Sequence, residues 1–311
     1  MKPSSFALSI AALAASVPAL AQEAPAPPGP QPQRVMRQMR PPPPVRTGER
    51  ADVALRLVAS MPTITATVNG RGPYRFGVDT GASGYLRVTP ELAAALGLQP
   101  VGEAMAGDPS GRNPIRIPVY RVDSLAFGGL TYAGISTTPL TLRGPSLAGI
   151  DGIIGIGFFE TMLLTIDYGR LRLSAEPGAL PAANGRDVVE ISYDRGGLIS
   201  MPLTIGETVH QVHLDTGNTR FPLFMPEASI AALPTRGEAR DIGRARTVSQ
   251  EVSLRAIDLA APVRVGATHL PVTAAGFPAV GRVGNIGSPA LATMAVTIDY
   301  PNRRLRIVPS N

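Results

Sequence analysis

Short runs in which hydrophobic and polar residues alternate are the main pattern of the chain, and they are typical of β-strands with one buried face. Residues 63–68 alternate in this way, and the Asn69-Gly70 pair that follows is a strong signal for a tight hairpin. Residues 74–78 form the expected return strand, and residues 199–214 repeat the same plan. No long amphipathic helix and no regular alternation of strands with helices is present. The pattern therefore predicts a mainly β protein.

Helical signals are short. Residues 90–96 are rich in Ala and Leu, with Thr89 in the N-cap position and Gly97 as the C-terminal stop, so one short helix is expected there. The Ala-rich run that follows Met225-Pro226-Glu227 is expected to be helical as well. Residues 102–113 carry several Gly, Pro and Asp residues and are predicted to form a loop. This loop leads into a strand at residues 115–119, and the resulting hairpin is a candidate flap.

One stretch of the chain occurs twice. Residues 76–83 and 212–219 are both β-prone runs that end in Asp-Thr-Gly, and Asp215 lies 136 positions after Asp79 (215 − 79). Further matches follow in the same order: Thr89-Pro90-Glu91 with Met225-Pro226-Glu227, Ile153-Ile154-Gly155 with Asn285-Ile286-Gly287, and Thr165-Ile166-Asp167-Tyr168 with Thr297-Ile298-Asp299-Tyr300. The chain therefore contains two copies of one module, and a two-copy repeat centred on a carboxylate suggests two carboxylates that meet about a pseudo-twofold axis.

Length and composition agree with two lobes. The 311 residues accommodate two domains of roughly 125 residues each. Aromatic residues make up 5% of the chain and Trp is absent, so the cores are expected to be aliphatic. We place the N-terminal lobe at residues 51–178 and the C-terminal lobe at residues 187–311. Residues 174–186, rich in Pro and Gly, are expected to contain the connection.

The first residues resemble an export signal. Lys2 precedes an apolar stretch at residues 6–17, and Ala19-Leu20-Ala21 is a small-residue cleavage site. We therefore expect residues 1–21 to be a signal peptide that is cleaved after Ala21, which would place the mature protein in the periplasm or outside the cell. Residues 22–50 are Pro-rich and are expected to be extended. They have two open interpretations, a linker or an inhibitory pro-segment.

Charge and cysteine content exclude several function classes. The absence of Cys excludes thiol catalysis and Cys-ligated metals. The net charge of +6 comes almost entirely from Arg, without a basic cluster interleaved with aromatic residues, so no nucleic-acid partner is predicted. His210 and His213 are three apart on a predicted strand and would point to opposite faces. Asp167 and Asp299 are interpreted as turn formers. We therefore predict no metal and no cofactor.

Two Asp residues on equivalent turns would share one proton and titrate as a coupled pair, because two neighbouring carboxylates do not ionise comfortably together. The ionised member can take a proton from water while the protonated member polarises a carbonyl group. Gly81 and Gly217 would let the backbone approach the carboxylates closely. Thr80 and Thr216 are expected to hold the two turns in register across the lobe interface.

With two Asp-Thr-Gly turns, each followed later by an apolar-apolar-Gly segment or its equivalent, the chain resembles the aspartic proteases. The hairpin entry, the turn at residues 79–83 and the Gly-rich apolar stretch at residues 151–157 are similar to the retropepsin-like branch of bacteria. Two such modules lie in one chain, as in pepsin-type enzymes, and the resemblance spans nearly all of residues 51–311. It implies a mainly β, bilobal acid-protease fold in which two β-barrel-like lobes with short helices are related by a pseudo-twofold axis.

The resemblance also implies roles for individual residues. It implies that the chain is an aspartic endopeptidase that acts on a peptide or protein substrate. Asp79 and Asp215 would be the catalytic dyad of a self-contained monomer. Supporting residues around the dyad would be Thr80, Gly81, Ala82, Ser83, Thr216, Gly217 and Asn218. Flap residues that cover the substrate would be Gly107, Asp108, Pro109, Ser110 and Gly111.

Two residues of the second copy depart from the family's pattern. Asn218 stands where the family usually has Ala, Ser or Thr, and Asn285 occupies a position that is normally apolar. We expect the Asn218 amide to donate a hydrogen bond to Asp215, which would favour the ionised form of Asp215 and leave Asp79 protonated. The departures keep two alternatives open. One is a catalytically silent descendant that binds peptides, and the other is an oligomer in which each lobe pairs with another chain.

Overall fold

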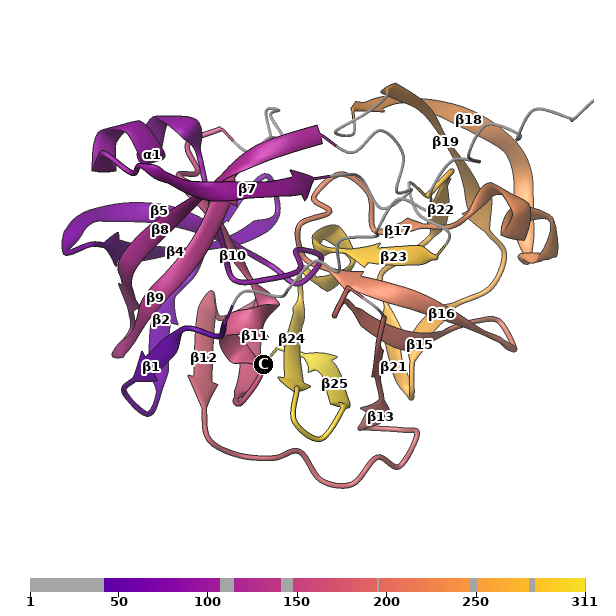
Figure 1. Cartoon of the computed structure of the whole chain (residues 1–311). Helices are drawn as coiled ribbons and strands as arrows, with labels where there is room; N and C mark the ends of the chain where they lie inside the picture. Colours follow the sequence, from indigo (N-terminus) through magenta and orange to yellow (C-terminus); the bar gives the residue numbers. More distant parts are fainter. Residues whose placement is uncertain are drawn as a thin grey trace, which may run out of the picture. The chain divides into compact units, whose positions relative to one another are not determined.

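A computed structural model describes residues 42–106, 115–140, 148–194, 196–246, 251–279 and 283–310. Arg40–Asn311 form one compact unit. Most of its described residues lie in β-strands, which form three sheets (Figure 1). The prediction of a mainly β protein is therefore confirmed. In the described part of the chain, no helix is long and apolar enough to cross a membrane.

A nine-stranded sheet contains the first Asp-Thr-Gly turn. Its centre is the β4–β5 hairpin, whose turn residues Asn69 and Gly70 both have positive φ, as a tight two-residue hairpin requires. A parallel strand, β10, lies on the other side of β5. The strands of this sheet are β1 (Val45–Thr47), β3 (Arg56–Val58), β4 (Met61–Val68), β5 (Arg71–Asp79), β6 (Leu86–Val88), β7 (Pro100–Ala106), β8 (Ile115–Phe127), β9 (Leu130–Pro139) and β10 (Gly152–Gly155).

A ten-stranded sheet contains the second Asp-Thr-Gly turn and repeats this plan. The β15–β16 hairpin corresponds to β4–β5, and β23 pairs in parallel with β16 as β10 does with β5. The strands are β14 (Ser192–Tyr193), β15 (Ile199–Ile205), β16 (Thr208–Asp215), β17 (Leu223–Phe224), β18 (Thr235–Arg246), β19 (Glu251–Leu259), β20 (Val263–Val265), β21 (Thr268–Leu270), β22 (Ala274–Phe277) and β23 (Gly284–Gly287).

A six-stranded sheet joins the two copies of the repeat. Its strands β11 and β24 pair antiparallel, and Thr165 lies directly opposite its own repeat equivalent, Thr297, with the two hydroxyl oxygens 3.1 Å apart (Figure 1). Each copy thus contributes one of the two strands at this junction. The strands are β2 (Ala51–Ala54), β11 (Leu163–Asp167), β12 (Arg172–Glu176), β13 (Val189–Glu190), β24 (Met294–Asp299) and β25 (Arg304–Pro309).

The helices differ between the copies. The expected helix is present as α1 (Pro90–Leu96), where Thr89 Oγ1 accepts a hydrogen bond of 3.1 Å from the Leu92 amide and Gly97 adopts the left-handed conformation. The corresponding run of the second copy was also expected to be helical, but it forms only a 3₁₀ helix, η3 (Glu227–Ala232), which has no side-chain cap. Two further 3₁₀ turns, η2 (Ile156–Phe159) and η4 (Ser288–Leu291), follow β10 and β23.

The structure corrects one prediction for the first copy. Residues 102–106 were expected to be loop, but they belong to β7, whose residues pair with β8 from Gly102–Val119 to Ala106–Ile115. The pairing partners of residues 102–106 lie between nine (115 − 106) and 17 (119 − 102) residues away, and they override the local turn signals. The flap residues Gly107, Asp108, Pro109, Ser110 and Gly111 lie outside the described residues.

The main core is largely aliphatic, as the composition predicts. Its aromatic members come from the first copy. Ring contacts link Phe127, Tyr132, Phe158 and Phe159, and the Tyr132 hydroxyl donates to the Phe158 carbonyl at 2.7 Å. Small apolar clusters lie apart from this core, and one of them, described below, lies beside the first Asp-Thr-Gly turn.

Candidate active site

Both Asp-Thr-Gly turns begin where a strand ends. Asp79 is the last residue of β5 and Asp215 the last residue of β16. Each Asp is paired with a glycine of the neighbouring parallel strand, Gly155 of β10 for Asp79 and Gly287 of β23 for Asp215. These glycines are required because the turn folds back over them. A Cβ at Gly155, for example, would lie 2.8 Å from the Ala82 carbonyl oxygen.

Four hydrogen bonds tie the two turns together. The Thr80 hydroxyl donates to the Leu214 carbonyl at 2.7 Å and accepts from the Thr216 amide at 3.0 Å. The Thr216 hydroxyl donates to the Val78 carbonyl at 2.7 Å and accepts from the Thr80 amide at 3.0 Å. Both threonines are completely buried. Because the two halves of this network have the same distances and roles, each turn fixes the position of the other.

The glycine of each turn lies against the carboxylate of the other. A Cβ at Gly81 would be 2.6 Å from the carboxyl carbon of Asp215, and a Cβ at Gly217 would be 2.5 Å from Oδ1 of Asp79. No side chain fits in either position. The structure therefore brings Asp79 and Asp215 into one site, with backbone amides at their oxygens.

Backbone amides support both carboxylates. Asp79 Oδ1 accepts from the Gly81 amide at 2.8 Å, and Asp215 Oδ1 accepts from the amides of Gly217 at 3.1 Å and Asn218 at 3.0 Å. Burial raises the pKa of Asp79 above its ordinary value, while the Gly81 amide and the positive charge of Arg87 oppose that rise.

Burial also raises the pKa of Asp215, to about 7, and the negative charge of Asp79 adds to this rise. The two carboxylates therefore titrate as a coupled pair, and the direction of the charge effect favours Asp215 as the member that keeps the proton. Asp79 and Asp215 both keep part of their surface exposed to solvent.

This assignment corrects the expected role of Asn218. Its side-chain amide does not donate to Asp215; it donates to the Phe221 carbonyl at 3.1 Å and to Oδ1 of Asn285 at 2.7 Å. Only its backbone amide contacts Asp215. The two residues that depart from the family pattern therefore pair with each other, and their effect on the second turn is structural.

The remaining predicted support residues differ in exposure. Ala82 is buried and packs with Leu140 and Ile153 in a small cluster beside the turn. Ser83 is exposed to solvent.

Asp167 and Asp299 are turn formers as expected, because their carboxylates accept hydrogen bonds from the amides of Arg170 and Asn302.

Sequence reasoning missed a buried hydroxyl pair behind the second turn. Ser288 donates to the Thr216 carbonyl at 2.7 Å, and its oxygen lies 2.9 Å from the Tyr168 hydroxyl. Both side chains are buried, and burial raises the pKa of Tyr168. A signal was present, because Ser288 occupies the repeat position of the apolar Ile156. It supports the backbone of the Asp215 turn through its hydrogen bond to the Thr216 carbonyl.

Arg87 was missed as well. It lies on β6 within an apolar run, and its charge acts on Asp79.

The described residues contain no group of three or more His, Cys, Asp and Glu side chains that could hold a metal ion.

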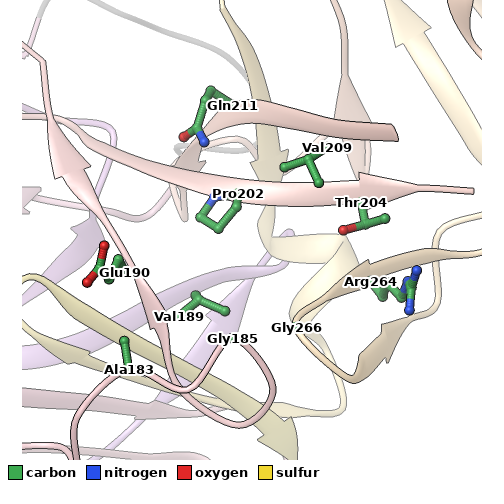
Figure 2. Close-up of a pocket in the computed structure, with 10 residues that line it drawn as sticks. All are labelled: Ala183, Gly185, Val189, Glu190, Pro202, Thr204, Val209, Gln211, Arg264 and Gly266. Carbon is green, nitrogen blue, oxygen red and sulfur yellow. The ribbon is translucent and has the colours of Figure 1, made fainter. Parts of the chain in front are cut away.

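A pocket of about 610 Å³ lies elsewhere, beside β15, β16 and β20 (Figure 2). Its polar lining comes from Glu190, Thr204, Gln211 and Arg264, and Figure 2 shows Glu190 and Arg264 on opposite sides of the labelled group. None of the predicted site residues lines it. The chemistry of the two carboxylates therefore does not involve this pocket.

Comparison with known families agrees with the geometry of the first turn. Residues 64–158 match the family model described as aspartyl protease, a span that contains Asp79 and the paired strands β5 and β10 but ends before Asp215. A search of curated proteins found no match. The family match supports a peptidase of the aspartyl protease type.

Proposed function

We propose that the chain is an exported aspartic endopeptidase whose two lobes, related by a pseudo-twofold axis, contribute one catalytic carboxylate each. The observation that supports this proposal is the reciprocal hydrogen bonding of Thr80 and Thr216, in which the two Asp-Thr-Gly turns make equivalent contacts with each other. The pairing of Thr165 with its repeat equivalent Thr297 supports the same symmetry at the lobe junction.

In the proposed reaction, ionised Asp79 accepts a proton from a water molecule as the water oxygen attacks the carbonyl carbon of the scissile peptide bond. Asp215 donates its proton to the carbonyl oxygen, which yields a neutral tetrahedral diol. The diol then collapses as one hydroxyl returns its proton to Asp215, while the proton held by Asp79 passes to the amide nitrogen and the C–N bond breaks. The products are a carboxylic acid and an amine, and the dyad returns to its starting protonation state.

The hydrogen bonds at the two turns support these roles. Asp79 and Asp215 both accept from backbone amides that cannot move independently of the turn, so the carboxylates are held in position before substrate binds. The raised pKa of Asp215, about 7, suits a general acid that must stay protonated in weakly acidic solution.

The test is cleavage of an unfolded protein, such as reduced and alkylated casein, between pH 3 and 8. Wild type is compared with Asp79→Asn and Asp215→Asn, and circular dichroism verifies that all three are folded. We expect cleavage by wild type alone, followed as new N-termini. Asp123→Asn, a change at an exposed carboxylate outside the site, is the matched control and should keep full activity.

Other outcomes would change the assignment. Loss of activity in Asp79→Asn alone would show that the second lobe is a scaffold, and the solution mass would then show whether a second chain completes the site. A folded wild type that binds peptides but cleaves none would point to the silent peptide-binding descendant. The proposed export is tested separately by N-terminal sequencing of the mature protein, which should begin at Gln22.

A further inference from the structure

Arg87 lies on the same face of the nine-stranded sheet as Asp79. Arg87 of β6 is paired with Ile153 of β10, and Ile153 is paired with Gly77 of β5. Side chains at paired positions point to the same face, and so do positions two apart on one strand. Asp79, two residues after Gly77, therefore points to the same side as Arg87.

The Arg87 guanidinium acts on Asp79 through its charge, which lowers the pKa of that carboxyl group. Among the described residues it makes no hydrogen bond and no ion pair, although the residue is partly buried. Two other arginines of the first copy do have partners: Arg71 donates to the Ala95 carbonyl at 2.7 Å and Arg116 pairs with Glu103 at 3.1 Å. The Arg87 guanidinium can therefore donate hydrogen bonds to a group that binds beside it.

An apolar surface borders this cation. Ala82, Leu140 and Ile153 form a cluster that is separate from the main core, and Ile153 is the residue opposite Arg87. The Met61 side chain covers Gly77, the residue paired with Ile153, because a Cβ at Gly77 would collide with it. A ligand that fits this surface would place methylene groups against the aliphatic cluster and a carboxylate against the Arg87 guanidinium. A short acidic side chain has both.

The second copy lacks this feature. At the equivalent rung, Phe224 of β17 is paired with Asn285 of β23. Phe224 is buried with Leu254 and Ala279 in an apolar cluster. In the neighbouring hairpin, Arg240 pairs with Asp258 at 2.8 Å and Arg244 with Glu251 at 3.6 Å. The two sides of the proposed site therefore differ in charge.

We propose that Arg87 binds the carboxylate of an acidic substrate side chain, so that the enzyme prefers Glu or Asp in the subsite formed by Arg87, Ala82, Leu140 and Ile153. This inference rests on the proposed function, because it assigns a substrate class to the same site. A guanidinium can hold a carboxylate through two parallel hydrogen bonds, which an amide of the same shape cannot reproduce.

Two synthetic pools of random peptides test the proposal, identical except that one contains Glu wherever the other contains Gln. Products of wild type, Arg87→Gln and Arg87→Lys are quantified by mass spectrometry. Wild type should cleave the Glu pool about tenfold faster than the Gln pool, with acidic residues enriched at one position from the cleaved bond. Arg87→Gln should lose this preference, and Arg87→Lys should retain part of it.

Equal cleavage of the two pools by wild type, or an unchanged preference in Arg87→Gln, would overturn the proposal. A shift of the pH–rate profile in Arg87→Gln with no change in preference would also overturn it, since Arg87 would then act only through Asp79. If wild type cleaves neither pool, the proposed function fails. The role of Arg87 is then decided by binding of the two fluorescently labelled pools, which wild type should distinguish and Arg87→Gln should not.

Discussion

Replacing Asp215 by Asn is expected to stabilise the folded chain at pH 8, although it removes a proposed catalytic group. Burial and the charge of Asp79 raise the pKa of Asp215 from its ordinary 3.8 to about 7. A carboxyl whose pKa is raised by folding contributes stability that is fully present below pH about 4 and is lost as the pH rises through about 7. The ionised folded state at pH 8 therefore carries a cost of up to about 4 kcal/mol.

Asn avoids this cost because it is neutral at every pH, and its oxygen can still accept from the amides of Gly217 and Asn218. The free energy of unfolding is measured by urea denaturation of wild type, Asp215→Asn and Asp123→Asn from pH 3.5 to pH 8. Asp215→Asn should match wild type at pH 3.5 and exceed it at pH 8 by about 2–4 kcal/mol.

The exposed Asp123 controls for a general effect of charge removal, and its variant should follow wild type at every pH. If Asp215→Asn shows no gain at pH 8, or if its gain is the same at pH 3.5, the raised pKa of Asp215 is refuted. The assignment of Asp215 as the proton donor would then lose its physical basis, even if the variant were inactive.

Three further predictions concern the dyad and the turns. Activity should follow a bell-shaped pH profile that falls above about pH 7 as Asp215 loses its proton and falls in acid as Asp79 gains one. Gly217→Ala should reduce kcat/KM by about 100-fold in a folded protein, because the new Cβ would displace the Asp79 carboxylate. Thr80→Val should lower the free energy of unfolding by about 3 kcal/mol, because it leaves two buried backbone groups unpaired.

Each of these has an outcome that would contradict it. A pH profile that stays flat to pH 9 would show that no proton is lost from the dyad near pH 7. Full activity in Gly217→Ala would mean that the close approach to Asp79 is not needed. Thr80→Ser keeps the hydroxyl and is the control for Thr80→Val; equal stability of the two variants would exclude the hydrogen bonds as the cause. Asn218→Ala should leave the pH profile in place, since its side chain does not contact Asp215.

Local sequence predicted the elements whose residues lie close together in the chain. The Asn69-Gly70 hairpin, the helix capped by Thr89 and the strands that end in Asp79 and Asp215 all formed as expected. The helix of the second copy was predicted less well because it lacks the side-chain cap of its counterpart. The strand at residues 102–106 was missed because its hydrogen bonds come from β8.

The repeat also carried long-range information. Two equivalent Asp-Thr-Gly turns in one chain predicted that Thr80 and Thr216 would meet, and the structure brings them together in a buried reciprocal network. Residues whose repeat equivalents are of a different type could not be placed in this way. Arg87, Ser288 and the side chain of Asn218 are examples, and they are also the residues at which the two copies differ.

The sequence by itself determined the strand pattern, the two modules and the identity of the candidate dyad, because alternation, turn chemistry and repetition are properties of neighbouring or equivalent residues. Only the tertiary structure decided how burial and charge act on the two carboxylates and what each unmatched residue contacts. Burial, the direction of a side chain on a sheet and the distance between charges depend on strands that are remote in sequence. Asn218 meets Asn285 67 residues later, and Arg87 shares a face with Asp79 only through β10.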